Sequence, residues 1–208
     1  MNNLFIAFDG LDGSGKDTQL NKIVDYLKNK DKYCNVWVTR EPTKITESGN
    51  IISKLLEGVV TKEDATKYFI SDRKEHSDII KSILKHSHVL TSRYDFSTYA
   101  YQIAQGMNFN DLYDAHNYNV ETLIPDITII FDVSVETAMA RINNRNQSKE
   151  YFENKEFLFN VKKQFDIVIQ KLIKKDGRNI MIIDGNQDIE SVTKNIIDHL
   201  RIYINTPK

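Results

Sequence analysis

The feature that most constrains this chain is an apolar run followed by a glycine-rich turn and an amphipathic helical pattern. The run is Leu4–Phe8, and the turn reads Gly-Leu-Asp-Gly-Ser-Gly-Lys-Asp-Thr over Gly10–Thr18. A strand, a glycine turn and a helix in this order form a phosphate-binding loop, whose backbone N–H groups and helix N-terminus face phosphate oxygens. Lys16 would add a full positive charge. An ordinary glycine turn is the alternative, but the register of glycines and lysine favours nucleotide binding.

The loop departs from the usual pattern at one position. A Ser or Thr normally follows the lysine and places its hydroxyl on Mg²⁺. Here Asp17 follows Lys16, and Thr18 comes one residue late. Either the metal ion is held in another way or the hydroxyl is dispensable in this protein.

The composition narrows the class of protein. With 208 residues, one α/β domain spanning residues 1–208 is expected. The balance of 28 Lys and Arg against 29 Asp and Glu argues against a general binder of nucleic acids or membrane surfaces. Cys34 is the sole cysteine, so no intramolecular disulfide can form. The N-terminus leaves no room for a signal peptide and no apolar run approaches the ~20 residues of a membrane helix, so we expect a cytoplasmic protein.

Apolar runs alternate with helical patterns along the whole chain. The predicted strands are Leu4–Phe8, Val36–Thr39, His88–Thr91, Ile127–Asp132 and Asn179–Ile183. The predicted helices are Lys16–Asn29, Gly49–Glu57, Lys62–Lys85, Phe96–Gln105, Asn110–Leu123, Val135–Asn144, Glu153–Lys174 and Ile189–Ile202. Strands that alternate with helices form a parallel sheet with right-handed crossovers. The predicted fold is therefore α/β, a five-stranded parallel sheet with helices on both faces.

Charged residues follow the predicted strands. Asp9 and Asp12 follow the first strand, Arg40 the second and Arg93 the third. In open parallel sheets, ligands bind beyond the carboxyl ends of the strands, so these side chains are expected to meet in one site. Phosphoryl transfer depends on positioning and on neutralising charge, and it needs such cations.

A polar segment, Asn143–Lys149, contains no large apolar residue. It is either a plain surface loop or a mobile lid that covers phosphates and excludes water. We place the lid at about residues 143–152, with Arg145 and Lys149 as its cations.

The segment after the third strand indicates a second ligand. Tyr94, Ser97, Thr98, Tyr101 and Gln102 combine hydroxyls, an amide and aromatic faces at helical spacing. Such a face can read the edge of a base and test a sugar. A helix that packs its aromatic side chains into the core is the alternative, and the residue types alone favour neither.

At these positions the chain resembles the thymidylate kinase family. The motifs that carry the resemblance are Phe8–Lys16, Thr39–Pro42, Phe69–Arg73 and Arg93–Gln102, followed in order by Phe131–Val133, Arg141…Arg145 and Ile182–Gly185. They span nearly the whole chain. The resemblance implies a P-loop nucleoside monophosphate kinase fold and transfer of the γ-phosphoryl group of ATP to dTMP, giving dTDP. It also implies Mg²⁺ as the metal cofactor and a homodimer.

The resemblance assigns roles to the residues of the second-ligand segment and the long helix before it. Phe69 would stack on the thymine ring, and Arg73 and Gln102 would hydrogen-bond to the base. Ser97 and Thr98 would line the same pocket.

Other family roles concern the acceptor phosphate and the sugar. Arg93 would hold the acceptor phosphate, and Arg40 and Glu41 also fall among the substrate-binding positions. Tyr101 would crowd the 2′ position and favour deoxyribose. Asp12 would meet the sugar 3′-hydroxyl and lie near the metal ion.

The remaining implied roles concern ATP and the transferred group. The ATP-binding positions are Gly10, Leu11, Asp12, Gly13, Ser14, Gly15, Lys16, Asp17, Thr18 and Arg141. The catalytic positions are Lys16, Arg93, Asp12, Arg145 and Lys149, and the metal positions are Asp17 and Asp12. The family has one form with an arginine in the phosphate loop and another with it in the lid. Gly13 occupies the loop position, so this chain resembles the lid form.

Three departures from the family pattern stand out. Asp17 replaces a hydroxyl residue, and Ser92 replaces the acid before Arg93. These two place one carboxylate at the helix start and remove one at the strand end, so we interpret them as a compensating pair. The glycines after Arg-Glu-Pro are absent, and Ser53 stands where an acceptor-phosphate arginine is expected.

Two alternatives to a thymidylate kinase remain open from the sequence. One is a related kinase for another deoxynucleotide or a deoxynucleoside, and the other is a nucleotide-binding regulator with weakened catalysis. For the dimer, the candidate surfaces are the helices Gly49–Glu57 and Lys62–Lys85, with Ile51, Ile52, Leu55, Ile79 and Ile83.

Overall fold

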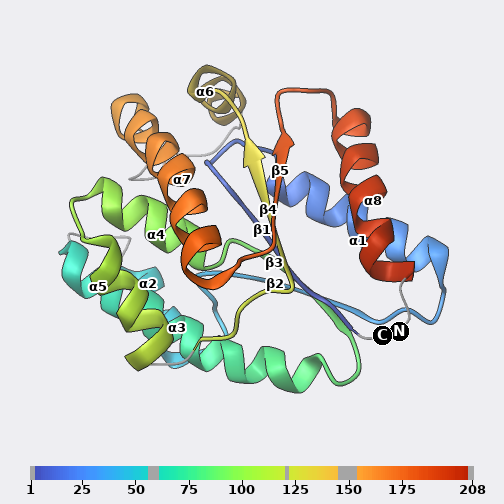
Figure 1. The fold of residues 1–208 in the computed structure, drawn as a ribbon, viewed down its shortest axis with the longest axis horizontal. Helices are drawn as coiled ribbons and strands as arrows, with labels where there is room; N and C mark the ends of the chain where they lie inside the picture. The colour runs from blue at the N-terminus through green and yellow to red at the C-terminus, as the bar shows by residue number, and fades with distance from the viewer. Residues whose placement is uncertain (1–2, 56–60, 120–121, 145–153, 206–208) are drawn as a thin grey trace.

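A parallel sheet runs through the centre of the structure, a computed structural model that describes residues 3–55, 61–119, 122–144 and 154–205 (Figure 1). Its strands are β1 (Phe5–Gly10), β2 (Val36–Arg40), β3 (His88–Ser92), β4 (Ile127–Asp132) and β5 (Ile180–Asp184). Their order across the sheet is β2-β3-β1-β4-β5, and every neighbouring pair is parallel. The sequence prediction of a five-stranded parallel sheet is confirmed.

Helices cover both faces of this sheet. They are α1 (Lys16–Lys30), α2 (Glu47–Leu55), α3 (Lys62–Ile83), α4 (Asp95–Ala104), α5 (Phe109–Asp114), the π-helical segment η1 (Ala115–Asn119), α6 (Val135–Asn143), α7 (Lys155–Asp176) and α8 (Ile189–Asn205). Side-chain caps fix several of their starts; Thr61, for example, accepts a hydrogen bond from the Asp64 N–H at the start of α3. Among the described residues, none of these helices is long and apolar enough to cross a membrane.

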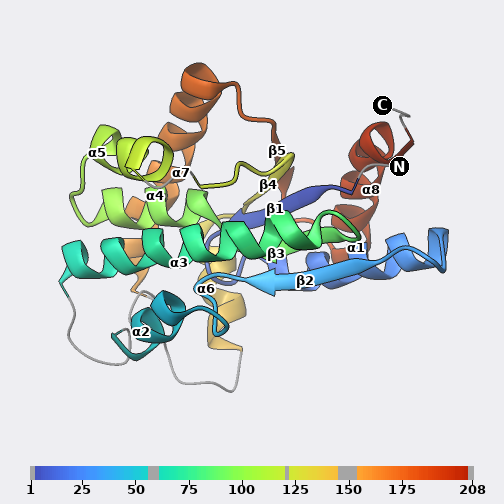
Figure 2. The ribbon, with the colours of Figure 1, turned by 90° about the horizontal axis from the view of Figure 1, so that it is seen from below.

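The two faces of the sheet are packed by different helices, as Figures 1 and 2 show. On one face, α1 and α8 pack against apolar side chains of β1, β4 and β5, including Ile6 and Ile129. On the other face, α4, α6 and α7 bury Ile130, and α3 packs near β1 and β3 through Ile80. The first and last described residues both lie at the end of the molecule near α8 (Figure 1).

One predicted helix is wrong in its extent. The pattern over Asn110–Leu123 predicts a continuous helix, but α5 ends at Asp114 and becomes the π-helical segment η1. The wider turn of η1 accompanies the burial of His116, whose carbonyl oxygen accepts the Thr122 N–H at 3.0 Å.

The strand register sets where the site lies. Phe8 of β1 is paired with Ser92 of β3, and Ser92 is paired with Arg40 of β2. The loops that follow β1, β2 and β3 therefore leave the sheet at the same edge, as expected for ligand sites in parallel sheets.

Candidate functional site

The turn after β1 has the backbone of a phosphate-binding loop. Gly13 and Gly15 both have positive φ, at 77° and 91°, and α1 begins directly after Gly15. A Cβ on Gly13 would lie 2.4 Å from the Ala138 carbonyl oxygen, so α6 packs directly on the loop. No side chain fits there, which excludes an arginine at this position in the packing observed.

Lys16 lies beneath this loop and is buried. Its Nζ donates to the Leu11 carbonyl oxygen at 3.3 Å and lies 3.7 Å from Asp12 Oδ1. Burial, helped by the positive charge of Arg93, lowers the pKa of Lys16 to about 8. An anion that enters the loop would stabilise the charged form of Lys16 and so raise this pKa.

Arg141 approaches the loop from α6. Its Nη1 donates to the carbonyl oxygens of Gly13 and Ser14 at 3.4 and 3.3 Å, and Nη2 donates to the Gly185 carbonyl oxygen at 2.9 Å. The sequence assigned Arg141 to ATP, and the structure places its guanidinium directly beside the predicted nucleotide loop.

Arg93 sits on a strained turn between β3 and α4. Its φ is +66°, a conformation that L residues other than Gly, Asn and Asp rarely adopt. Its guanidinium forms an ion pair with Asp12, donates to the Ser97 hydroxyl at 3.0 Å and lies 5.2 Å from the Tyr101 ring centroid. The Tyr101 hydroxyl in turn donates to Asp12 at 3.1 Å. The structure thus brings these predicted site residues together.

The neighbouring cations keep Asp12 ionised. Burial opposes its ionisation, but Arg93 and Lys16 outweigh burial and hold the pKa of Asp12 well below its usual range. Its oxygens face two cations and the Tyr101 hydroxyl.

The two substituted positions, Asp17 and Ser92, touch each other. The Ser92 hydroxyl donates to Asp17 Oδ1 across the gap between β3 and α1. Although burial opposes ionisation of Asp17, Lys16 and the Ser92 hydrogen bond lower its pKa, and Arg40 adds to this effect. Arg40 itself is exposed at the end of β2.

Arg73 is buried in a network of polar side chains within the protein. It is 1% exposed; Nε and Nη2 donate to Glu41 Oε2 at 2.9 and 2.5 Å, and Nη2 also donates to the Thr98 hydroxyl at 3.0 Å. Its Nη1 lies 2.6 Å from Nε2 of the buried His116. Glu41 is likewise buried, and it also pairs with His76 Nδ1 at 2.9 Å.

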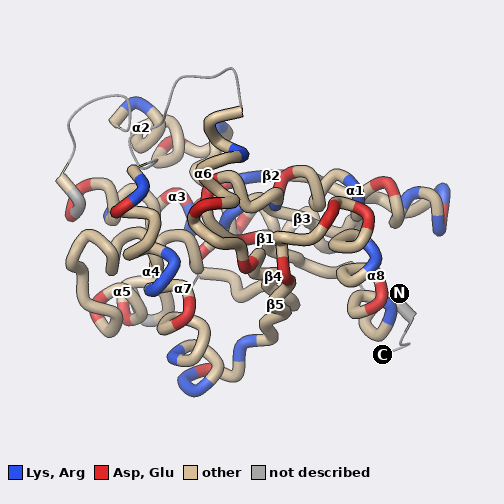
Figure 3. The backbone as a smooth tube through the Cα atoms, turned by 90° about the horizontal axis from the view of Figure 1, so that it is seen from above, with Lys and Arg blue, Asp and Glu red and all other residues tan. Residues whose placement is uncertain are grey.

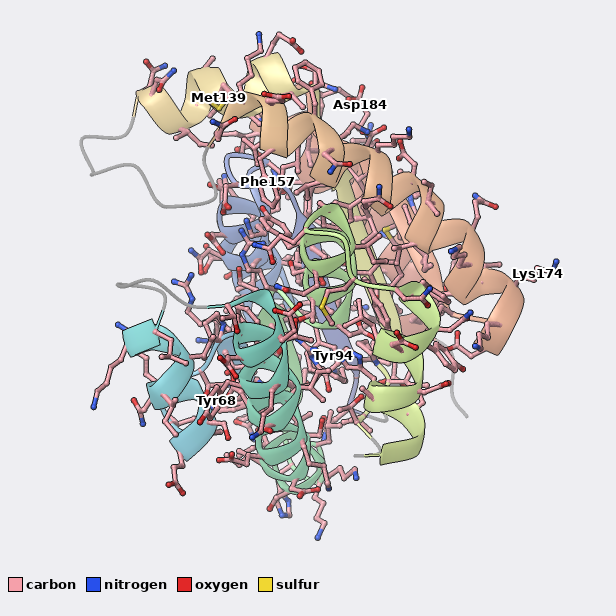
Figure 4. The ribbon with its side chains drawn as sticks, turned by 90° about the vertical axis from the view of Figure 1, so that its left-hand side faces the viewer. Tyr68, Tyr94, Met139, Phe157, Lys174 and Asp184 are labelled. Carbon is pink, nitrogen blue, oxygen red and sulfur yellow. The ribbon has the colours of Figure 1, made fainter. Side chains whose placement is uncertain are left out.

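The other predicted base-pocket residues surround this network. Gln102 is buried, and its Oε1 accepts from the Thr66 hydroxyl at 2.8 Å. Phe69 is half-buried on α3. Tyr101 packs edge-on against Phe157, whose position at the start of α7 is labelled in Figure 4.

The loop that replaces the family glycines is held by α3. Asp72 accepts hydrogen bonds from the Thr43 N–H and hydroxyl at 2.8 and 2.6 Å and from the Thr46 hydroxyl. Ser53, at the position of the missing arginine, donates to the Gly49 carbonyl oxygen within α2.

The sequence does not predict every residue of this site, and two residues that it does predict are not among those that the structure describes. The lid cations Arg145 and Lys149 belong to the undescribed segment 145–153. No sequence pattern marks His116, a lone histidine within a helical segment, as a neighbour of Arg73. Asp9 was noted at a strand end without a role, although the structure buries it against the Arg93 turn. Charges of both signs occur along α1 and α7, and Lys is more frequent than Asp and Glu in each helix (Figure 3).

The fold and this site define a phosphotransferase of the P-loop nucleoside monophosphate kinase class. A family model described as thymidylate kinase matches residues 8–196. A probable thymidylate kinase of Methanococcus aeolicus is 38% identical over 200 residues, covering 95% of this chain and 96% of the relative. Thymidylate kinases of Sulfurihydrogenibium sp. and Mycoplasmopsis agalactiae are each 33% identical, over 209 and 208 residues, covering 95% of this chain and, respectively, 96% and 94% of the relative. The chain belongs to the thymidylate kinase family.

Proposed function

We propose that this protein transfers the γ-phosphoryl group of ATP to dTMP and releases dTDP and ADP. The observation that carries the proposal is the convergence of Lys16, Arg93 and Asp12 beside the phosphate loop. An acceptor that is already a phosphate needs no strong general base. The protein's task is to align two phosphates and neutralise their charge.

The two cations would divide this task. Lys16 lies under the loop and would meet the β- and γ-phosphates of ATP, while Arg93 lies between the loop and α4 and would meet the acceptor phosphate. Ser53 stands where the family has an arginine for the acceptor phosphate. We propose that Arg40, which is exposed at the end of β2, binds this phosphate instead. Arg145 and Lys149 would close over the transferred group as lid cations.

The base would be read at the α3–α4 face. Phe69 would stack on the ring, and Gln102 and Thr98 would meet its polar edge. Arg73 already donates to Glu41 and Thr98. We therefore propose that it supports base binding through its buried positive charge and by holding the Thr98 hydroxyl. Tyr101, hydrogen-bonded to Asp12, would stand at the sugar and favour a deoxyribose.

Mg²⁺ would be held by Asp17, with Ser92 as its neighbour. A carboxylate and a hydroxyl are the hard oxygen ligands that Mg²⁺ prefers, and both lie at the mouth of the phosphate loop. Asp12 fits this part less well, because its oxygens already face Arg93, Lys16 and Tyr101. The bound ion would neutralise phosphate charge and so make the acidic Asp17 tolerable at this position.

We also propose a cytoplasmic homodimer packed through α2 and α3. Ile52 is fully buried and Ile83 packs against the core beside β1, so these two serve the fold of one chain. Ile51, Leu55 and Ile79 are half-buried and remain candidates for the interface.

A coupled assay of ADP release, run over a panel of acceptors, tests the function. We expect dTMP to be the best substrate and dUMP to be poorer, since a lost methyl contact in a closed pocket is worth roughly 1–3 kcal/mol. Faster turnover of dCMP or dGMP would exclude the proposed base pocket. A preference for thymidine itself would exclude the proposed role of Arg93, and no turnover of any acceptor would indicate a regulator.

A further inference from the structure

Asp9 is a buried carboxylate that the reaction scheme above does not use. It stands near the end of β1, is 0% exposed, and points into the turn that carries Arg93. Its Oδ2 accepts the Tyr94 N–H at 3.0 Å, and its Oδ1 accepts the Ser97 hydroxyl at 2.5 Å. A charged group buried this fully needs a specific reason to be there, because burial alone is unfavourable.

The hydrogen bonds around Ser97 have only one consistent direction. Burial raises the pKa of Asp9 to about 6 against the lowering effect of the Ser97 hydrogen bond, so the group is a carboxylate, and acceptor only, above neutral pH. The single hydroxyl proton of Ser97 must therefore point at Asp9. The lone pair of the same oxygen is then left for Arg93 Nη1, which donates to it at 3.0 Å. Asp9 thus fixes the orientation in which Ser97 accepts from Arg93.

The same carboxylate holds the backbone of the turn. Arg93 has φ +66°, and such a conformation persists only where surrounding contacts enforce it. The Arg93 N–H donates to the Phe8 carbonyl oxygen at 2.9 Å, and the next N–H, that of Tyr94, donates to Asp9. The two ends of the guanidinium are then held by Asp12 and Ser97.

We propose that Asp9 is a positioning residue for Arg93, acting through Ser97 and the Tyr94 N–H to hold the guanidinium where it meets the acceptor phosphate. This inference rests on the proposed function of Arg93. It also reassigns Ser97, which the sequence placed in the base pocket, to the support of Arg93.

Steady-state kinetics of Asp9→Asn, Ser97→Ala and the double variant, measured at pH 7.5, test this role. Asn keeps an acceptor for the Tyr94 N–H, but its NH₂ would face Ser97 and turn the hydroxyl proton toward Arg93. We expect kcat/KM for the acceptor to fall about tenfold to hundredfold in each single variant, the range expected when a charge-assisted hydrogen bond to a reacting group is lost. KM for ATP should stay within about twofold of the parent, because Lys16 and the loop are untouched.

The double variant separates a shared path from two independent effects. If Asp9 acts through Ser97, the double variant should be no more than about twofold worse than the poorer single variant. Losses that multiply would overturn the proposal, as would an acceptor kcat/KM within twofold of the parent in a folded Asp9→Asn or Ser97→Ala protein. If Asp9→Asn does not fold, Ser97→Ala carries the test alone.

Asp95→Asn is the matched control. Asp95 is a similarly buried carboxylate at the start of α4, the helix that follows the Arg93 turn, but it pairs with Arg178 at 2.6 Å. This variant should lower the unfolding midpoint while leaving the acceptor kcat/KM within twofold of the parent. All variants are compared on whichever monophosphate the parent uses best, so a failure of dTMP specificity is distinguishable from a failure of the Asp9 inference.

Discussion

The buried contact between His116 and Arg73 makes the stability of this protein depend on pH. Arg73 can only donate, so His116 Nε2, 2.6 Å from Arg73 Nη1, must accept. The other ring nitrogen, Nδ1, then carries the proton and donates to the Leu112 carbonyl oxygen at 2.7 Å. Protonation of Nε2 would remove an acceptor and place two positive charges side by side in a fully buried position.

The size of the effect follows from the pKa of His116. Burial, reinforced by the charge of Arg73, lowers it from 6.5 to about 3. Between these two values the unfolded chain binds more protons than the folded chain, so the free energy of unfolding falls as the pH falls. The full contribution is present above pH 6.5. At pH 5, about 1.5 units lower, the loss amounts to about 2 kcal/mol, at 1.36 kcal/mol per unit.

Urea unfolding at pH 7.5 and pH 5.0 measures this loss. His116→Gln keeps a polar group near Arg73 but removes the titration, so the parent should lose about 2 kcal/mol more than the variant between these pH values. His199→Gln is the matched control, since His199 makes the same kind of bond to the carbonyl oxygen four residues earlier, at 2.8 Å, but is exposed. Equal losses in the parent and in His116→Gln would refute the assigned protonation state.

Three other predictions concern the phosphate loop, the loop held by α3, and assembly. Asp17→Thr alone should weaken activity and raise the Mg²⁺ concentration that activity requires. Adding Ser92→Asp should bring both quantities back toward those of the parent. Mn²⁺ binding to the ADP complex, followed by EPR, should likewise weaken in Asp17→Thr and recover in the double variant. Unchanged Mn²⁺ binding and full activity of Asp17→Thr at limiting Mg²⁺ would contradict the compensating pair. Gly49→Ala should lower the free energy of unfolding in urea by about 1–3 kcal/mol. The added Cβ would lie 2.4 Å from the Thr43 carbonyl oxygen and 2.6 Å from Asp72 Oδ1. A variant as stable as the parent would show that α2 can move. Light scattering at micromolar concentration should give twice the 24.2 kDa mass of the chain, and the mass of one chain would refute the dimer.

Local patterns predicted the parts of this molecule that depend on local physics. The run of Leu4–Phe8, the glycine turn and the helix after it follow from short-range sequence alone, and the structure has all three. The order of strands and helices also predicts that Asp12 and Arg93 meet at the carboxyl ends of the strands, and the resemblance adds Tyr101 to the same site. The three residues do contact one another.

Long-range contacts were beyond the reach of those patterns. The pairing of Arg73 with Glu41 joins residues 32 positions apart, and its contact with His116 spans 43. The resemblance implies that Arg73 hydrogen-bonds to the base, but it does not reveal that the same guanidinium contacts Glu41, Thr98 and His116 within the protein. The overlong helix prediction at residues 110–123 has a similar origin, because the burial of His116 interrupts a pattern that is regular in sequence.

Phosphoryl transfer from ATP should end on the phosphate of dTMP. Incubation with ATP labelled at the γ-phosphate, dTMP and Mg²⁺, with the products separated by chromatography, tests it directly. The label should appear in dTDP, in amounts equal to the ADP formed, and should vanish from that product when Arg93 is replaced by Met. Label released as inorganic phosphate, or carried by another acceptor in preference to dTMP, would contradict the account.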